Sequence, residues 1–152
     1  MELDNIDRRI LRLLQRDNRL TNVALAELIG LSPPACLKRV KLLRQQGVID
    51  REVAILNPKL AGLAITMIVE VEMERDRPDL YQRFSREIQQ APEVTQSYQV
   101  TGEVDFVLIV SVDSMESFQQ FVERVLYAEP NIRKFRTLIS MKRDKFTTEL
   151  PL

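Results

Sequence analysis

The chain has 152 residues, of which 45% are hydrophobic, and its 22 basic and 22 acidic side chains give no net charge. No apolar run approaches the roughly 18 residues of a transmembrane helix and the N-terminus lacks an apolar signal region, so we expect a cytoplasmic protein with no membrane partner. The single cysteine, Cys36, excludes an internal disulfide framework, and the absence of histidine argues against an enzyme and against a metal site.

Positive charge is concentrated near the N-terminus. Residues 1–50 carry nine Lys or Arg and six Asp or Glu, a net +3, whereas residues 51–152 carry 13 and 16, a net −3. Residues 31–46 hold four basic side chains and no acidic one. Contacts with DNA phosphates require a local basic surface of this kind, whatever the net charge of the chain.

Two helices are predicted before Gly30. The first begins at the N-cap Asp4 and ends near Asp17, and its buried stripe has helical spacing: Ile6, Ile10, Leu13 and Leu14. Thr21 can cap the second helix, whose predicted core positions are Val23, Ala26 and Leu28 or Ile29. Gly30 follows this helix in the position of a C-terminal cap.

A third, basic helix follows this turn. Ser32 is its predicted N-cap, Pro33 and Pro34 occupy its first turn, and its core face comprises Cys36, Val40 and Leu43. A short helix, a turn that contains glycine and a basic helix are typical of a helix-turn-helix, whose second helix enters the DNA major groove. Residues 48–56 then have the pattern of a short strand, a wing, and residues 57–62 that of a linker.

After the linker, strand and helix patterns alternate. Strands are predicted over residues 65–73, 94–100, 104–112 and 133–142, and helices over 79–90 and 114–126, the latter with a capping box of Asp113 and Glu116. This order predicts an α+β protein, in which a winged helix-turn-helix (1–56) and a linker (57–62) precede a ferredoxin-like βαββαβ domain (63–152). Both helices would cover one face of an antiparallel sheet, and the other face could pair with a second copy in a dimer.

The basic helix supplies the candidate DNA contacts: Ser32, Pro33, Ala35, Leu37, Lys38, Arg39, Lys41 and Arg44. Lys38 and Arg39 could reach bases or phosphates, whereas Lys41 and Arg44 are placed for phosphates. Leu37 could contact a thymine methyl group or pack within a dimer. A charge cluster can be only a solvated helix face, but the turn, the cap and the missing acids favour DNA contact. Cys36 is interpreted as a small buried hydrophobic residue rather than a redox sensor.

The hairpin of residues 101–105, TGEVD, is the candidate ligand site. Gly102 permits a tight turn whose backbone N–H groups point outward and suit a carboxylate. Asp105 has the opposite parity to Val104 and Phe106, so we expect it to point away from their apolar face and to be available for an ammonium group. Taken alone, these residues favour a plain hairpin with a solvated aspartate. Thr147, Thr148 and Glu149 follow the last strand and form either an ordered tail or a frayed end, and the sequence alone favours the frayed end.

Four segments together resemble the Lrp/AsnC family of leucine- and asparagine-responsive transcription regulators: LDNIDRRILRLLQRDNRLTNVALAELIGLS, SPPACLKRVKLLRQQGVI, TGEVDFVLIV and TTELPL. The resemblance covers nearly the whole chain. It implies a helix-turn-helix, an amino-acid-sensing domain, and dimers that assemble further, often into octamers of four dimers. It places an effector between dimers, near Gly102, Glu103 and Asp105, with Thr101 adjacent and Thr147 and Thr148 completing the pocket. Val104 stands where many members carry an aromatic or other residue, so the identity of the effector does not transfer.

We therefore expect a sequence-specific regulator that binds double-stranded DNA and whose activity or assembly responds to a free amino acid, with no other cofactor. The alternative is an architectural protein that wraps DNA through its oligomer with little effector control, in which Asp105 is incidental. An enzyme is not expected, because the sequence shows no nucleophile–base pair, no metal-ligand spacing and no phosphate loop.

Overall fold

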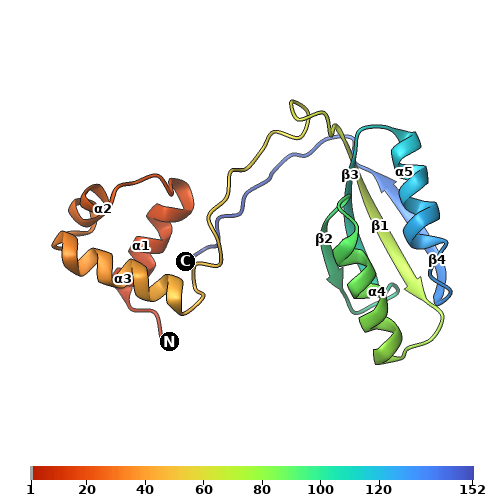
Figure 1. Cartoon of the computed structure of the whole chain (residues 1–152), viewed down its shortest axis with the longest axis horizontal. Coiled ribbons are helices and arrows are strands. Elements are labelled where there is room, and N and C mark those ends of the chain that lie inside the picture. The colour runs from red at the N-terminus through yellow and green to blue at the C-terminus, as the bar shows by residue number, and fades with distance from the viewer. Residues whose placement is uncertain (1) are drawn as a thin grey trace. The chain divides into compact units, whose positions relative to one another are not determined.

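The structure, a computed structural model, describes residues 2–152 and divides the chain into two compact units (Figure 1). We call the chain up to Ile55 together with Asp144–Leu152 the N-terminal unit, and Leu56–Arg143 the sheet unit. This division differs from the predicted C-terminal domain of residues 63–152, because residues 144–152 return to the first helix. Within residues 2–152, no helix has the length and apolar character needed to cross a bilayer.

Helices α1 (Asn5–Arg16), α2 (Asn22–Ile29) and α3 (Pro33–Gln45) build the N-terminal unit. The three predicted N-caps are confirmed, since each of these side chains accepts a hydrogen bond from a backbone N–H group in the first helical turn: Asp4, Thr21 and Ser32. Gly30, with φ of 76°, ends α2 in the left-handed conformation that favours glycine.

The core of this unit comprises Ile10, Leu11, Leu25, Ala26, Ile29, Cys36, Val40 and Leu43. The predicted core face of α3 is confirmed, and burial raises the pKa of the Cys36 thiol, as expected for an inert cysteine. In α2 the prediction was wrong at Val23, which is 63% exposed, while Leu25 is buried. This short helix is apolar on nearly every side, so its sequence does not mark one face as buried.

The predicted wing does not form a strand. Residues 48–56 contain no strand, and Val53 and Ile55 are 62% and 59% exposed. Extended backbone becomes a strand only beside a partner that satisfies its N–H and C=O groups, and no segment between residues 2 and 152 takes that place. The predicted linker contains a turn, in which the N–H of Ala61 donates to the carbonyl of Asn57.

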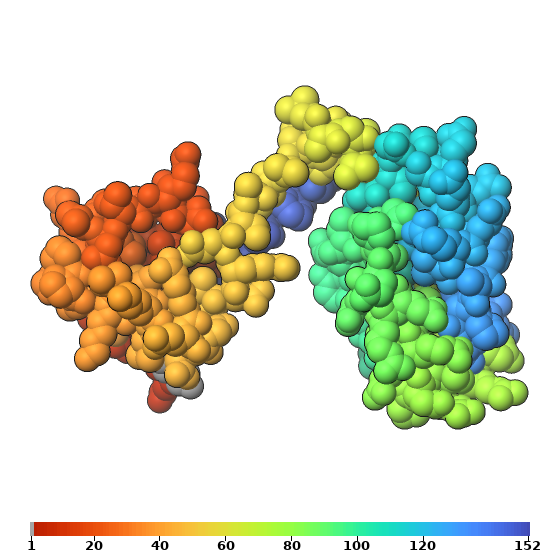
Figure 2. Space-filling view, in the orientation of Figure 1, coloured from red at the N-terminus to blue at the C-terminus, as the bar shows by residue number. Residues whose placement is uncertain are grey.

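The sheet unit has the predicted split order of elements: β1 (Ile65–Met73), α4 (Pro78–Gln90), β2 (Val94–Gln99), β3 (Phe106–Val112), α5 (Met115–Phe121), the π-helix η1 (Val122–Leu126) and β4 (Ile132–Ile139). The four antiparallel strands lie in the order β2-β3-β1-β4. Helices α4 and α5 both cover one face of the sheet (Figures 1 and 2). The predicted ferredoxin-like fold is confirmed.

Strand alternation decides which side chains face these helices. Four residues of β1 are buried at alternate positions, Met67, Val69, Val71 and Met73. Phe84 of α4 meets Phe106 of β3 edge to face, with ring centroids 5.1 Å apart. We call the other side of the sheet the open face, since no element of the sheet unit itself covers it. It carries apolar and paired charged side chains: Ile68, Glu70, Glu72, Val107, Ile109, Arg136 and Leu138.

Helix α5 begins after Ser114, one residue later than predicted. The Ser114 hydroxyl accepts the N–H of Ser117 at 3.1 Å, and the carboxylate of Asp113 accepts hydrogen bonds from the Ser117 and Ser114 hydroxyls, which lower its pKa. The predicted capping box of Asp113 and Glu116 is therefore wrong, because the serine stands where its oxygen reaches the free N–H group.

Candidate nucleic-acid interface and ligand loop

The free basic side chains of α3 lie on its outer stripe. With about 3.6 residues per helical turn, Pro34, Lys38, Lys41 and Gln45 lie opposite the core positions. Lys38 and Lys41 are exposed, and no carboxylate within residues 2–152 forms an ion pair with either of them. These two ammonium groups satisfy the electrostatic requirement for binding phosphates.

Arg39 occupies a different position from the one predicted. Its Nη1 atom lies 2.8 Å from Asp4 Oδ2 and 2.8 Å from Asp7 Oδ1, so it joins α3 to the start of α1. The N–H of Asp7 and the guanidinium of Arg39 lower the pKa of Asp4. In this arrangement Arg39 is committed to two carboxylates and holds α3 in place, rather than pointing freely towards a base.

The other predicted DNA contacts are exposed. Arg44 pairs with Glu52, and because both side chains are half exposed, a phosphate could replace this carboxylate at small cost. The start of α3 exposes four of the predicted residues, Ser32, Pro33, Ala35 and Leu37. The Ser32 hydroxyl serves as the N-cap of the helix.

Two residues that the sequence did not single out join the helices of the N-terminal unit to one another. The side-chain amide of Asn22 donates to the carbonyl of Pro33 at 2.8 Å, which joins the starts of α2 and α3. Arg9 of α1 donates to the carbonyls of Leu28 and Ile29 at the end of α2. Each contact joins different helices, so no local sequence pattern could have revealed it.

Asp105 is half-buried and turns towards α4 rather than away from it. Its Oδ1 accepts the hydroxyl of Tyr81 on α4 at 2.6 Å, and its Oδ2 accepts the N–H of Met73 at 2.6 Å. The expected outward orientation was wrong, because residue 105 precedes β3 and does not follow the alternation of that strand. Burial and the hydrogen bond to Asp105 raise the pKa of Tyr81 well above its usual value.

Asp105 therefore closes the loop of residues 101–104. Its backbone N–H donates to Val71 at 2.8 Å, and its carbonyl accepts the N–H of Val100 at 2.9 Å. No group in residues 2–152 accepts a hydrogen bond from the backbone N–H of Gly102, Glu103 or Val104. Gly102 has φ of 117°, in the region that favours glycine. The loop thus presents free donors on a fixed base.

A depression of about 490 Å³ lies beside Tyr81. It is formed by α4 and the end of β2, and polar side chains predominate in its lining: Asp76, Pro78, Tyr81, Gln82, Ser85, Arg86, Gln89 and Gln99. Tyr81 thus contacts the depression as well as the carboxylate that closes the loop.

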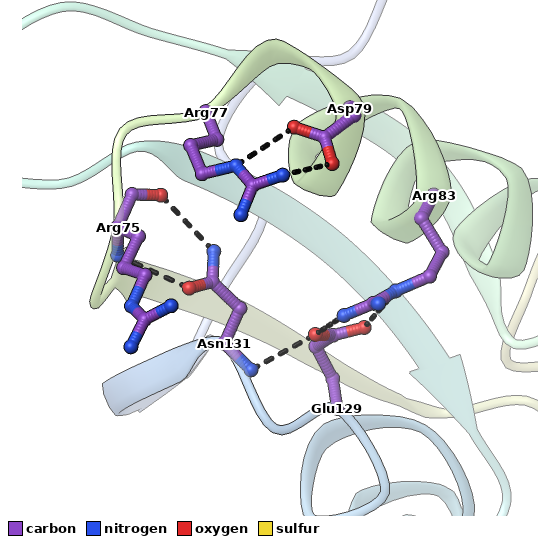
Figure 3. Close-up of polar contacts among 6 residues, drawn as sticks. All are labelled: Arg75, Arg77, Asp79, Arg83, Glu129 and Asn131. Carbon is purple, nitrogen blue, oxygen red and sulfur yellow. Dashed lines mark hydrogen bonds and ion pairs between the residues drawn. The ribbon is translucent and has the colours of Figure 1, made fainter.

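Figure 3 shows a polar cluster that fixes the turn between β1 and α4. Glu129, whose side chain is only 1% exposed, accepts Nη2 of Arg83 at 2.5 Å and the N–H of Asn131 at 2.9 Å. The side-chain amide of Asn131 binds both the N–H and the carbonyl of Arg75, each at 3.1 Å. The cluster holds α4, and with it Tyr81, against the sheet.

Thr147 and Thr148 belong to the N-terminal unit and not to the unit that holds the loop. Thr147 Oγ1 accepts the N–H of Glu149 at 3.0 Å, and the residues that follow contact α1, so the tail is not the frayed end that the sequence favoured. Within the chain itself, the structure does not bring these threonines into one unit with residues 101–105. In the described part of the chain, no group of three or more side chains could hold a metal ion.

Comparison with known proteins identifies both units. Residues 66–150 match the Lrp/AsnC ligand binding domain, and residues 3–50 match a winged helix-turn-helix DNA-binding domain. The chain belongs to the Lrp/AsnC family. It is accordingly a DNA-binding transcription regulator with a ligand-binding domain, and the function of its family is regulation rather than catalysis.

Full-length relatives support this identification. An HTH-type transcriptional regulator of Sinorhizobium fredii is 44% identical over 100% of this chain and 90% of its own length. The leucine-responsive regulatory protein of Escherichia coli is 34% identical over 98% of this chain and 91% of its own. The crystal structure of a Neisseria meningitidis transcriptional regulator in complex with L-Met is 33% identical, covers 99% of this chain and 97% of its own, and has a TM-score of 0.91.

Proposed function

We propose that this cytoplasmic regulator reads double-stranded DNA through α3 and responds to a free amino acid that binds at the loop of residues 101–105. The free backbone N–H groups of Gly102, Glu103 and Val104 carry the effector part of the proposal. Adjacent N–H groups without an acceptor at a glycine turn suit a carboxylate, which every free amino acid has. Asp105 holds the loop in this shape. It would also bind the ammonium group of the amino acid, through a carboxylate lone pair that accepts no hydrogen bond from Tyr81 or Met73.

A thermal-shift panel of the purified protein against the twenty amino acids tests the effector site. A ligand at about 100 times its Kd stabilises the folded form by about 2.7 kcal/mol, and we expect a shift for one side-chain class. The carboxamide of that amino acid should give no shift, because it lacks the carboxylate.

Two matched variants test the loop. Gly102→Ala should abolish the ligand shift, because a side chain at φ of 117° strains the loop. Gly62→Ala, at φ of 84° in the linker turn, introduces comparable strain elsewhere and should retain it. A flat panel with intact DNA binding would contradict the effector site and would favour the architectural alternative.

For DNA, we propose phosphate contacts by Lys38 and Lys41, a supporting phosphate contact by Arg44, and base-edge contacts by Ala35 and Leu37 near the start of the helix. Substituting either lysine by alanine should lower the slope of log K against log salt by about 1. Lys59→Ala, in the linker turn, is the matched control and should leave this slope unchanged. If both lysine variants kept the salt slope of the wild type, as Lys59→Ala should, the outer stripe of α3 would not belong to the interface.

For assembly, we propose a dimer formed by the open face, with further assembly into an octamer of four dimers. Ile68, Val107, Ile109 and Leu138 would be buried in that dimer. A two-fold dimer would read half-sites about one DNA turn apart, roughly 34–36 Å, or a multiple of that. Sedimentation should show that Ile109→Lys is monomeric, whereas Gln90→Lys, on the exposed side of α4, assembles normally. A dimeric Ile109→Lys would place the interface elsewhere.

A further inference from the structure

The chain's C-terminal segment binds α1 through a side-chain amide. Gln15 Nε2 donates to the carbonyl of Leu150 at 3.2 Å, and Gln15 Oε1 accepts the N–H of the same residue at 2.6 Å. One amide thus satisfies both backbone groups of one residue, as a neighbouring strand would. The two residues are 135 positions apart in sequence, so this contact joins the two ends of this chain.

Two residues near Leu150, Glu149 and Leu152, add a charge contact and an apolar contact. Arg16 Nε lies 2.8 Å from Glu149 Oε1, next to Gln15 on the helix. Leu152 packs against the hydrophobic core of the N-terminal unit. The segment therefore makes three kinds of contact with the N-terminal unit: an ion pair with Arg16, backbone hydrogen bonds with Gln15, and apolar packing against the core.

The segment is also shaped for this contact by its own residues. The hydroxyl of Thr147 accepts the N–H of Glu149 at 3.0 Å, and the N–H of Leu152 donates to the carbonyl of Leu150 at 2.9 Å. The second bond spans Pro151 in a γ-turn, for which the restricted φ of proline is suited. These local bonds reduce the conformational freedom that the segment loses on docking.

We propose that α1 carries a peptide-binding site for the segment Glu149–Leu152, an acidic residue followed by Leu-Pro-Leu, and that its natural occupant is this segment of the same chain. Gln15 and Arg16 recognise the peptide, and the apolar core edge receives Leu152. The chain passes between its two units after Ile55 and again before Asp144. The docked segment thus makes a second link from the ligand-binding unit to the DNA-binding unit.

Hydrogen exchange on the full chain tests the docking. In the wild type, the backbone N–H of Leu150 should be protected from exchange because Gln15 accepts it. Gln15→Ala should raise its exchange rate by roughly tenfold, the combined effect of two hydrogen bonds of modest net strength. Gln90→Ala, an exposed glutamine of α4 with no hydrogen-bond partner in residues 2–152, is the control and should leave the rate unchanged.

A peptide of residues 144–152, labelled at its N-terminus, tests recognition directly by fluorescence anisotropy. A chain that ends at Thr148 should bind it saturably, and Gln15→Ala in that chain should weaken binding by roughly tenfold. Circular dichroism reports whether the shortened chain folds, and if it does not, the exchange rate of Leu150 in the full chain decides. An unprotected Leu150 amide in the wild type, or no peptide binding by a folded shortened chain, would overturn the proposal. Neither assay contains DNA or a free amino acid, so failure here is distinct from failure of the proposed function.

Discussion

Removing the hydroxyl of Tyr81 should destabilise the sheet unit without leaving a cavity in it. Tyr81 is 9% exposed, and its ring packs against Phe106 with centroids 5.4 Å apart. Tyr81→Phe keeps this packing and deletes only the 2.6 Å hydrogen bond to the Asp105 carboxylate. A hydrogen bond to a charged group contributes about 1.5–3 kcal/mol, so we expect a loss of that size in the free energy of unfolding.

Urea unfolding of the wild type and of Tyr81→Phe, followed by circular dichroism, measures this loss. Tyr127→Phe is the control, because Tyr127 is 72% exposed and its ring contact with Phe135 does not involve the hydroxyl. It should change stability by less than about 0.5 kcal/mol. If Tyr81→Phe were as stable as the wild type, the hydrogen bond would not hold Asp105, and the account of how the loop is fixed would fail.

Burial of Tyr81, together with the same bond, predicts a change in stability at alkaline pH. The folded protein raises the pKa of Tyr81 above its unfolded value of 10.0, so the neutral phenol is favoured in the folded state. This contribution is fully present below that unfolded value and is lost as the pH rises through the higher folded one. Wild-type stability should therefore decline above about pH 10, and Tyr81→Phe should decline less steeply. Parallel alkaline profiles would contradict the assigned shift.

Three further variants test the ion pairs of Arg39 and of Glu129. Arg39→Met should lower the stability of the N-terminal unit by about 1–2 kcal/mol in urea unfolding, whereas Arg19→Met, at an 89% exposed side chain, should not. Arg39 also helps to lower the pKa of Asp4 in the folded protein, so Asp4 contributes stability above its unfolded pKa that is lost as the pH falls through the folded pKa. In Arg39→Met, the free energy of unfolding should therefore fall less steeply as the pH is lowered, and an unchanged acid profile would contradict this. Glu129→Gln should cost about 1–3 kcal/mol, and Arg83→Met should cost more, because it leaves a buried carboxylate unpaired; the reverse order would be inconsistent with the burial of Glu129.

Short-range patterns predicted most of the fold. The caps at Asp4, Thr21 and Ser32 act within one helical turn, and the alternation in β1 repeats every two residues, so both can be read locally. These patterns and the order of elements were enough to predict a helix-turn-helix followed by a ferredoxin-like domain. They did not predict a partner for residues 48–56, because a strand also requires a second segment.

The sequence by itself determined the helices and the four strands of the sheet unit, their order, and the basic character of the helix that carries Lys38 and Lys41. Only the tertiary structure decided that Arg39 binds Asp4 and Asp7, that Asp105 faces Tyr81, and that the C-terminal segment docks on α1. Each of these contacts joins residues that are 24 to 135 positions apart. Periodicity and capping describe neighbours along the chain, whereas the partner of a charged or polar side chain depends on which elements pack together.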